Sequence, residues 1–340
     1  MGKSKKRGIK IPCDTDFSIL IPMYDFRLLA THHVQYFVPI TEDYAKRKLQ
    51  LLKASKLITS IPISGGYQNK KRQGSAYAIT GKGISLLRKY GYDVQKTRDE
   101  LRVTKEQMPF LLTGYDAAFE LQKYGWSFEE QRKLKKNLNL DRQSVVRGKL
   151  TSPAGVEWIF FVTLGSTCNT TLAKFKKDME SIKRYPNKAI IVTGARALKE
   201  TIDYFMKEES IVRESLRCNI IPKPYIHSYF RYLSTDKEFF SFLQQLNHRV
   251  KQVETGHELE QWQTYDGYAV VNLLDMDLAK VYELYNSQAV YQGRIKGFKV
   301  ITSPQLQDIH KELLGHLPYV HFEQMDMGIF AEHFETIQIN

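Results

Sequence analysis

The fold of the N-terminal region is decided by residues 41–80, which read TEDYAKRKLQLLKASKLITSIPISGGYQNKKRQGSAYAIT. The first part predicts a helix that begins at Thr41, a residue suited to cap it, and runs to about Lys56. The segments on either side of residues 65–74 are β-branched and alternating, and residues 65–74 themselves form a glycine-bounded basic loop. The stretch therefore predicts a helix followed by a β-hairpin with a long basic tip.

The predicted helix has two different faces. A spacing of 3.6 residues per turn places apolar residues on one stripe and long polar residues on the opposite side. The apolar stripe is Ala45, Leu49 and Leu52, and the polar face is Asp43, Lys46, Arg47, Gln50 and Lys53. Lys, Arg and Gln side chains reach guanine and adenine edges in the major groove of DNA. We therefore expect Lys46, Arg47, Gln50 and Lys53 to contact bases.

Two shorter helices are expected before this one, over residues 17–26 and 29–38, the second with Thr31 as its N-cap. Three helices, a strand, a basic loop and a second strand follow one another in the order of a winged helix, which we predict for residues 16–95. The wing residues expected to contact phosphates are Tyr67, Lys70, Lys71 and Arg72. The following GKGISLLRKYGYD predicts a further helix that packs on this domain or forms a dimer contact.

Basic residues are concentrated at the N-terminal end. Residues 1–90 carry 17 Lys and Arg against 5 Asp and Glu, whereas residues 91–340 carry 33 against 32. Residues 1–15 form a predicted flexible arm in which Lys5, Lys6 and Arg7 are candidate DNA contacts. A solvated tail without a role in binding is an equally open interpretation. The segregation of charge indicates double-stranded DNA as a partner, because cations that neutralise phosphates release counterions.

The rest of the chain alternates strand and helix patterns. Residues 109–225 predict an α/β domain with buried central strands, and residues 226–340 predict a further α/β region whose role the sequence does not reveal. The expected strands are 144–150, 156–165, 188–194, 217–223, 268–275 and 298–303, and the expected helices are 114–124, 170–185, 195–209, 276–286 and 304–315. The fold class is therefore α+β and α/β, divided into several domains.

Four segments carry a resemblance to a known family. They are RLLATHHVQYFVPITEDYAKRKLQLLKASKLI with the basic loop after it, AYAITGKGISLLRKYG, AAFELQKYGWSFEEQRKL, and KFKKDMESIKRYPNKAIIVTG. Over roughly residues 17–210 the chain resembles the replication-relaxation family of plasmids and integrative elements, and more distantly the MOBC-type mobilisation proteins. The resemblance implies a winged helix joined to a domain similar to restriction endonucleases, acting on element DNA in replication or transfer.

The resemblance also implies where nuclease carboxylates would lie. At the two positions where the family pattern has acidic residues, this chain has Ser144 and Thr163. A divalent cation would lack its usual anionic ligands there, so we expect the domain to be an inactive, degenerate endonuclease fold and assign no catalytic residue. Substitute candidates are Asp141, Glu157 and Asp178 with Lys149, Lys174 or Lys177. Basic residues that would extend a DNA surface, or form a solvated helix face, are Arg132, Lys133, Lys135, Lys136 and Arg142.

Other chemistry has little support, and no cofactor or metal is expected. The chain has no GxxxxGK[ST] loop for phosphates, and its three cysteines lie too far apart for a metal knuckle or a disulfide framework. The group His310, His316, His321 and Glu323 fits no zinc spacing. His32 and His33 are neighbours expected to point in different directions, which makes them a poor metal pair.

The sequence thus predicts a cytoplasmic, sequence-specific DNA-binding protein of a mobile element that acts in replication, mobilisation or regulation. A membrane partner is not expected, because no run of about 18 apolar residues occurs. A homodimer is expected, since helix-turn-helix proteins commonly match two-fold symmetric sites. Replication or transfer proteins of the element are further candidate partners. The alternatives are a metal-dependent nickase or relaxase of the PD-(D/E)XK type and an assembly protein that coats nucleic acid.

Overall fold

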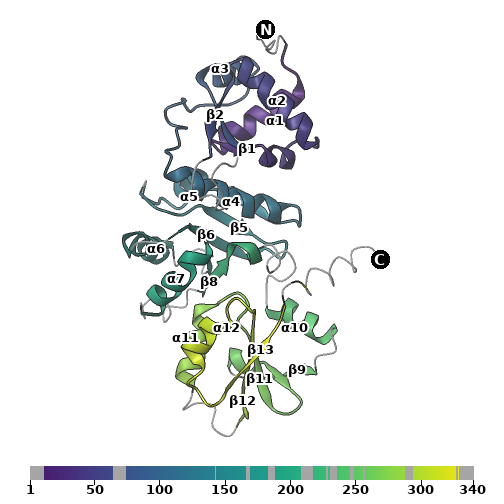
Figure 1. Cartoon of the computed structure of the whole chain (residues 1–340), viewed down its shortest axis with the longest axis vertical. Helices are drawn as coiled ribbons and strands as arrows, with labels where there is room; N and C mark the ends of the chain where they lie inside the picture. The colour runs from purple at the N-terminus through teal and green to yellow at the C-terminus, as the bar shows by residue number, and fades with distance from the viewer. Residues whose placement is uncertain are drawn as a thin grey trace, which may run out of the picture. The chain divides into compact units, whose positions relative to one another are not determined.

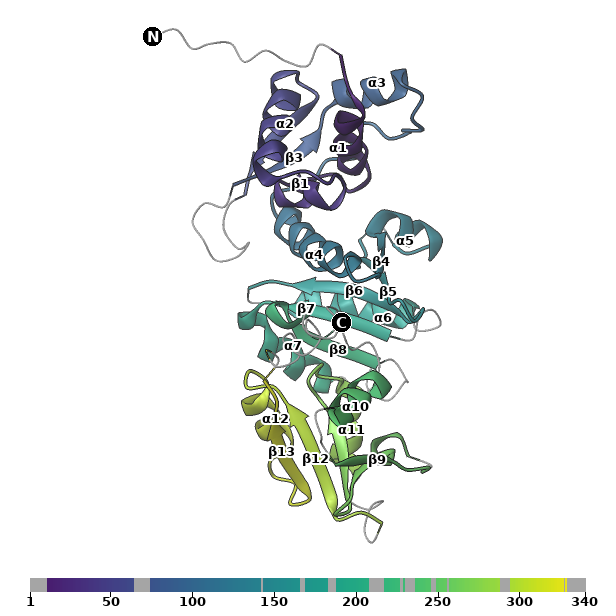
Figure 2. The ribbon, with the colours of Figure 1, turned by 90° about the vertical axis from the view of Figure 1, so that its right-hand side faces the viewer.

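The structure is a computed structural model and describes residues 11–63, 74–141, 143–165, 169–182, 188–207, 217–226, 229, 236–245, 249–255, 257–287, 294–326 and 328. The chain divides into two compact units, Met1–Phe119 and Glu120–Asn340. Three sheets occur among the described residues, so the protein has a mixed α and β fold, as predicted. Figures 1 and 2 show the elements of both units.

The first unit packs helices on a small antiparallel sheet. In chain order it begins with α1 (Asp14–Asp25), β1 (Leu29–Ala30), the 3-10 helix η1 (His32–Tyr36), α2 (Glu42–Ala54), β2 (Ile58–Pro62) and β3 (Ser75–Ile79). They are followed by α3 (Gly81–Lys89) and by α4 (Gln107–Gln122), which crosses into the second unit. The strand order is β1-β3-β2. The core includes Leu20, Leu29, Leu49 and Leu87, all 0% exposed.

The helix predicted for residues 29–38 is wrong. Leu29 and Ala30 form a strand instead, because they pair with Tyr77 and Ala76 of β3. Only residues His32–Tyr36 turn, as a short 3-10 helix, and the Thr31 side chain makes no capping hydrogen bond. Pairing with a strand more than forty residues away overrides the local helical pattern.

The second unit contains two sheets with the same strand arrangement. The first has the order β4-β5-β6-β7-β8 and the second β13-β12-β11-β10-β9. The strands of the first are β4 (Ser127–Glu130), β5 (Gly148–Thr151), β6 (Glu157–Thr163), β7 (Lys188–Thr193) and β8 (Arg217–Pro222). The strands of the second are β9 (Val250–Gln252), β10 (Trp262–Thr264), β11 (Tyr268–Asn272), β12 (Gly297–Thr302) and β13 (Val320–Gln324).

Each sheet starts with three antiparallel strands and continues with two parallel ones. The first pairs β4, β5 and β6 antiparallel and then β6, β7 and β8 parallel, and the second repeats this from β9 to β13. The helices that join the parallel strands are α6 (Asn169–Ile182), α7 (Ala195–Lys207), α11 (Leu278–Asn286) and α12 (Gln307–Leu314). The other helices among the described residues of this unit are α5 (Gln131–Asn137), η2 (Lys223–Tyr225), α10 (Asp236–Gln245) and η3 (Glu258–Glu260). Residues 120–340 therefore contain one topology twice.

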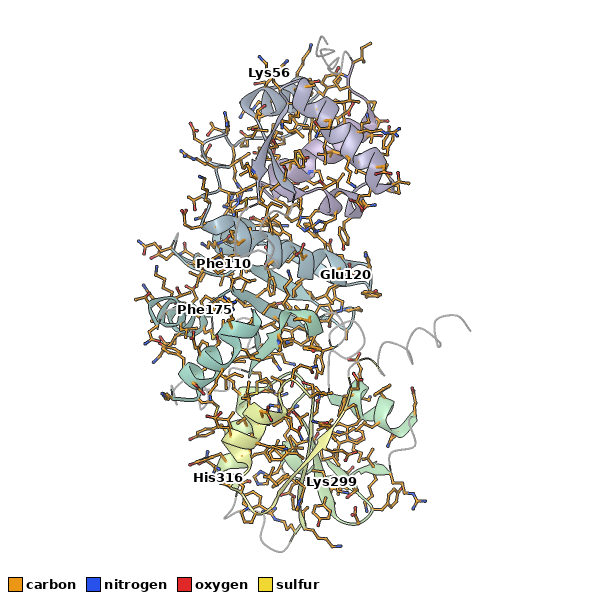
Figure 3. All side chains as sticks on the ribbon, in the orientation of Figure 1. Lys56, Phe110, Glu120, Phe175, Lys299 and His316 are labelled. Atoms are coloured by element: carbon orange, nitrogen blue, oxygen red, sulfur yellow. The ribbon has the colours of Figure 1, made fainter. Side chains whose placement is uncertain are left out.

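A single apolar core joins the two sheets of this unit. It includes Phe161 and Ile191 of the first sheet with Phe175 of α6, and Val271 and Val300 of the second sheet. Figure 3 labels Phe175 beside the first sheet. The pattern that predicted buried β6 and β7 is thus confirmed, whereas β5 begins at Gly148, four residues later than expected.

Candidate nucleic-acid interface

Helix α2 has the two faces that its sequence predicts. The Thr41 hydroxyl accepts a hydrogen bond from the Tyr44 backbone N–H at 3.3 Å, which satisfies one of the free donors at the helix start. The apolar stripe is buried completely, since Ala45, Leu49 and Leu52 are each 0% exposed. The four candidate base-contacting residues are exposed: Lys46, Arg47, Gln50 and Lys53. Packing fixes one side of the helix and leaves the other to solvent.

The four exposed side chains differ in the partners they already have. Lys46 lies 2.7 Å from Glu42 and 3.8 Å from Asp43, and the hydrogen bond with Glu42 raises the pKa of its ammonium group. Lys53 donates a 2.6 Å hydrogen bond to the Ser60 hydroxyl of β2. Within the described part of the chain, Arg47 and Gln50 form no side-chain hydrogen bond and no ion pair. These two donors are therefore available to a ligand without breaking an internal contact.

A largely buried lysine on the same helix has a structural role instead. Lys48 Nζ lies 2.8 Å from Asp16 Oδ1, with the two side chains 11% and 1% exposed, and it also contacts Cys13 Sγ at 3.2 Å. Burial lowers the pKa of Lys48, but the hydrogen bonds to Asp16 and Cys13 outweigh it, so the pKa is raised. This ion pair fixes α2 against α1. Helical spacing alone does not identify this pair, although Lys48 borders the buried stripe at Leu49.

The remaining candidate DNA contacts lie outside the described residues. These are Lys5, Lys6 and Arg7 of the arm and Tyr67, Lys70, Lys71 and Arg72 of the predicted wing. Arg142 also lies outside them. The strands β2 and β3 that would carry the wing pair in antiparallel register from Ile58 with Ile79 to Pro62 with Ser75.

The two positions expected to have lost nuclease carboxylates are buried. Thr163 and Thr193 are register partners at the ends of β6 and β7, each is 0% exposed, and neither hydroxyl has a hydrogen-bond partner in the described residues. Ser144 Oγ lies 3.0 Å from Asp178 Oδ2, which also accepts from the Val145 backbone N–H at 2.7 Å. Burial raises the pKa of Asp178. Asp178 therefore contributes to the packing of the residues that precede β5.

Glu157 and Lys149 meet across two strands, together with Glu129, which was not among the residues predicted for this site. Lys149 Nζ lies 2.6 Å from Glu157 Oε1 and 3.6 Å from Glu129 Oε2. Partial burial lowers the pKa of Lys149, but the hydrogen bond to Glu157 and the charges of both carboxylates outweigh it and raise the pKa. Glu157 is the register partner of Thr151, so it lies on the same face of the β5–β6 pair as Lys149.

The other candidates of this segment are dispersed. Asp141 accepts a hydrogen bond from the Gln143 backbone N–H at 2.8 Å and so closes a turn. Lys135 donates to the Ser144 carbonyl oxygen at 2.5 Å, and Arg132 lies 3.5 Å from Glu130. The basic residues with exposed side chains are Lys133, Lys136, Lys174 and Lys177.

His32 and His33 converge, contrary to the expectation that they point apart. Their Nε2 atoms lie 2.8 and 2.7 Å from the same Asp116 oxygen. The Ala30 backbone N–H donates to His33 Nδ1 at 3.2 Å, so neutral His33 carries its proton on Nε2 and donates it to Asp116. A metal ion at this point would have to displace that proton. The cluster is therefore a hydrogen-bonded clamp between η1 and α4.

The C-terminal histidines do not form one site. His310 is buried, with Nδ1 2.7 Å from the Thr302 hydroxyl and Nε2 2.9 Å from Met276 Sδ. Burial lowers the pKa of His310 to about 4. His316, labelled in Figure 3, packs against Tyr285, whereas His321 packs against Tyr268.

Two further findings concern membrane-spanning helices and the cysteines. Among the described residues, no helix has both the length and the apolar character required to cross a membrane. Cys13 is exposed, whereas Cys218 is buried and its thiol pKa is raised by that burial.

Comparison of the chain with models of protein families, with curated proteins and with solved structures finds no match. The candidate interface is accordingly defined by its own geometry.

Proposed function

We propose that the first unit is a winged helix that binds duplex DNA, with α2 in the major groove and the β2–β3 hairpin against the backbone. The order α1, β1, η1, α2, β2, β3 and the β1-β3-β2 sheet support this arrangement. The observation that carries the proposal is the outer face of α2. It presents Arg47 and Gln50, which are exposed and form no side-chain hydrogen bond or ion pair with the residues that the structure describes, in the part of the chain where nearly all the excess positive charge lies.

The chemistry follows from the donors available. Arg47 can donate two parallel hydrogen bonds to guanine O6 and N7, and Gln50 can pair with adenine N6 and N7. Lys46 is paired with Glu42 and lies near Asp43, so it binds a DNA phosphate only by giving up its contact with a carboxylate. Arg47 and Gln50 therefore determine base preference, while Lys46, Lys53 and the hairpin contribute affinity.

A selection experiment tests this function. The full chain is used to select duplexes from a random pool, and binding is then compared between the selected duplex and a scrambled one. We expect a preference that Arg47→Ala removes and Lys89→Ala does not. Lys89 is a suitable control, since it is an exposed cation in the last turn of α3. Equally weak binding to the selected and the scrambled duplex would instead favour a protein that coats nucleic acid.

We propose a role on a mobile element and a two-fold symmetric dimer as the working assembly. The resemblance to the replication-relaxation family supports a role in the replication or transfer of such an element. The usual two-fold symmetry of helix-turn-helix sites supports the dimer. The antiparallel strands β4 to β6, followed by α6 and parallel β7, support an endonuclease-like fold for the domain after it. Light scattering of the chain with and without selected DNA measures the assembly.

The second candidate function is a metal-dependent nickase. It is favoured by Glu129 and Glu157, whose carboxylates both lie within 3.6 Å of Lys149 on neighbouring strands. Two carboxylates and a lysine are the residue types that such nucleases use, but here the ammonium group neutralises the carboxylates. Supercoiled plasmid incubated with the protein and Mg²⁺ or Mn²⁺ separates the candidates. Nicking that Glu157→Gln or Asp141→Asn abolishes would establish the enzyme.

A further inference from the structure

The first unit contains a groove that DNA reading by α2 does not use. It has a volume of about 470 Å³ and lies against β2 and β3, where Thr59, Ile61 and Ala78 line it. Thr59 is the register partner of Ala78, so these two side chains share one face of the sheet. The neighbouring pair, Ser60 with Tyr77, faces the opposite side, and Ser60 is the residue that Lys53 of α2 contacts. The groove and α2 therefore lie on opposite faces of the same hairpin.

The groove is lined by three arginines and one carboxylate. These are Arg27, Arg98, Arg102 and Asp99. Arg98 and Arg102 are exposed, and within the described ranges neither has an ion pair or a side-chain hydrogen bond. Arg98 and Arg102 therefore add positive charge to the groove that no ion pair within the described ranges neutralises, which favours an anionic ligand.

The backbone at Arg27 is a second unusual feature of the groove. Arg27 follows α1 with a φ of +70°, in the left-handed region that helix ends usually fill with glycine. An arginine in this conformation is strained, and strained residues gather at binding sites where the surrounding structure holds them. The side chain is partly buried at the groove.

The wall that carries Arg98 and Arg102 is fixed in place although it contains no regular element. The Lys96 backbone N–H donates to the Tyr24 hydroxyl at 2.7 Å, and Arg88 Nε donates to the Val94 carbonyl at 2.9 Å. Glu100 accepts hydrogen bonds from both the backbone and the hydroxyl of Thr97, at 2.7 and 2.8 Å. Leu101 between the two arginines is 4% exposed and anchors the turn. The backbone that carries the two arginines is thus fixed before a ligand arrives.

We propose that this groove binds a phosphate ester of nucleotide size. Guanidinium groups donate pairs of parallel hydrogen bonds to phosphate oxygens, and three of them surround the groove. Ile61, Ala78 and Leu101 supply an apolar floor for a sugar or base, while Thr59 and Asp99 supply acceptors for its hydroxyl or amino groups. The volume falls in the range of small-molecule sites. The phosphate belongs either to a free nucleotide or to the DNA backbone.

Equilibrium binding to the full chain tests the site and separates the two sources. The probes are methylanthraniloyl-labelled ATP and GTP, competed with inorganic pyrophosphate, and a fluorescein-labelled duplex. The double variant Arg98→Ala/Arg102→Ala should lose about ten- to a hundredfold in affinity for the ligand that uses the groove. Arg102→Lys should recover part of it, because lysine keeps the charge but not the paired geometry. Both side chains are exposed, so thermal melting of the variants should match that of the parent.

Each result has one meaning for the site. Loss of labelled nucleotide binding at unchanged duplex affinity assigns a free nucleotide to the groove. Loss of duplex affinity, with a salt slope reduced by about two, assigns the DNA backbone. Unchanged binding of both probes overturns the site, as does equal loss in the Lys89→Ala control. Arg47→Ala should weaken duplex binding and leave nucleotide binding unchanged, so failure of this site and failure of the proposed DNA reading remain distinguishable.

Discussion

The outer face of α2 and the ends of β6 and β7 both carry polar side chains, but only the helix presents them to solvent. Arg47 and Gln50 are exposed and form no side-chain hydrogen bond or ion pair within the described residues, whereas Thr163 and Thr193 are 0% exposed. Near β5, Ser144 and Asp178 are likewise buried and bonded to each other. A binding surface needs polar groups that a ligand can reach and that folding has not already used. This difference supports the proposed role of α2 in recognition and assigns the buried polar groups of the sheet to packing.

The largest expected effect is the loss of a buried carboxylate in the sheet region. Asp178→Ala leaves the Ser144 hydroxyl and the Val145 N–H without their acceptor, and should cost about 2–4 kcal/mol of unfolding free energy. Asp178→Asn keeps an acceptor oxygen and should cost less. Glu180→Ala, at an exposed position of the same helix, is the control. Urea unfolding measures all three, and an Asp178→Ala variant as stable as its parent would refute the packing role.

Removing a hydrogen-bond donor from the exposed face of α2 should weaken DNA binding and leave the stability of the protein unchanged. Arg47→Ala and Gln50→Ala should each lower the preference for the selected duplex by about 1–3 kcal/mol, because the discrimination comes from paired base contacts. Fluorescence anisotropy against selected and scrambled duplexes gives the difference. Equal losses on both duplexes would turn these residues into backbone contacts and break the contrast with the sheet.

A pH titration extends the contrast to a buried histidine. The folded-state pKa of His310 is about 4, below its ordinary value of 6.5. Folding therefore excludes a proton, so the stability from neutral His310 is complete above pH 6.5 and is lost as the pH falls toward 4. We expect a loss of about 1 kcal/mol at pH 5.5 that His310→Gln abolishes and His316→Gln does not. Thermal melting across this range shows it, and identical profiles for parent and His310→Gln would contradict it.

The smallest expected effects concern electrostatics of the basic unit. Lys71→Ala should weaken binding to all duplexes alike and reduce the salt slope by about one. Glu42→Gln frees Lys46 from its 2.7 Å ion pair and should raise DNA affinity by less than about threefold, with little change in stability. Titrations at several salt concentrations resolve both. If Lys71→Ala altered the base preference instead, Lys71 would contact bases in a DNA groove rather than phosphates.

The sequence predicts α2 well because the signals that form it are local. A capping threonine, two acidic residues in the first turn and an apolar stripe lie within thirteen positions of one another. The same holds for α3, α6 and the buried strands β6 and β7. Base-contact candidates on α2 could likewise be chosen from helical spacing alone.

What the sequence did not predict depends on contacts between distant segments. Leu29 and Ala30 form a strand only because β3 lies beside them, and His32 and His33 converge only on Asp116, more than eighty residues away. Glu129 joins Lys149 through the register of β4 and β5. The groove beside β2 and β3 combines Arg27, Thr59, Ile61 and Ala78 with residues of the segment from Arg98 to Val103, and no single sequence pattern relates them. Pairing of this kind is set by tertiary packing rather than by local propensity.

The most direct test of the central claim is the amide spectrum of the full chain, recorded while selected duplex is added at low salt. We expect shifts for the amides of α2 between Lys46 and Lys53, and none at Thr163 or Thr193. Spectra in which α2 stays unmoved while the strand ends of the second unit shift would contradict it.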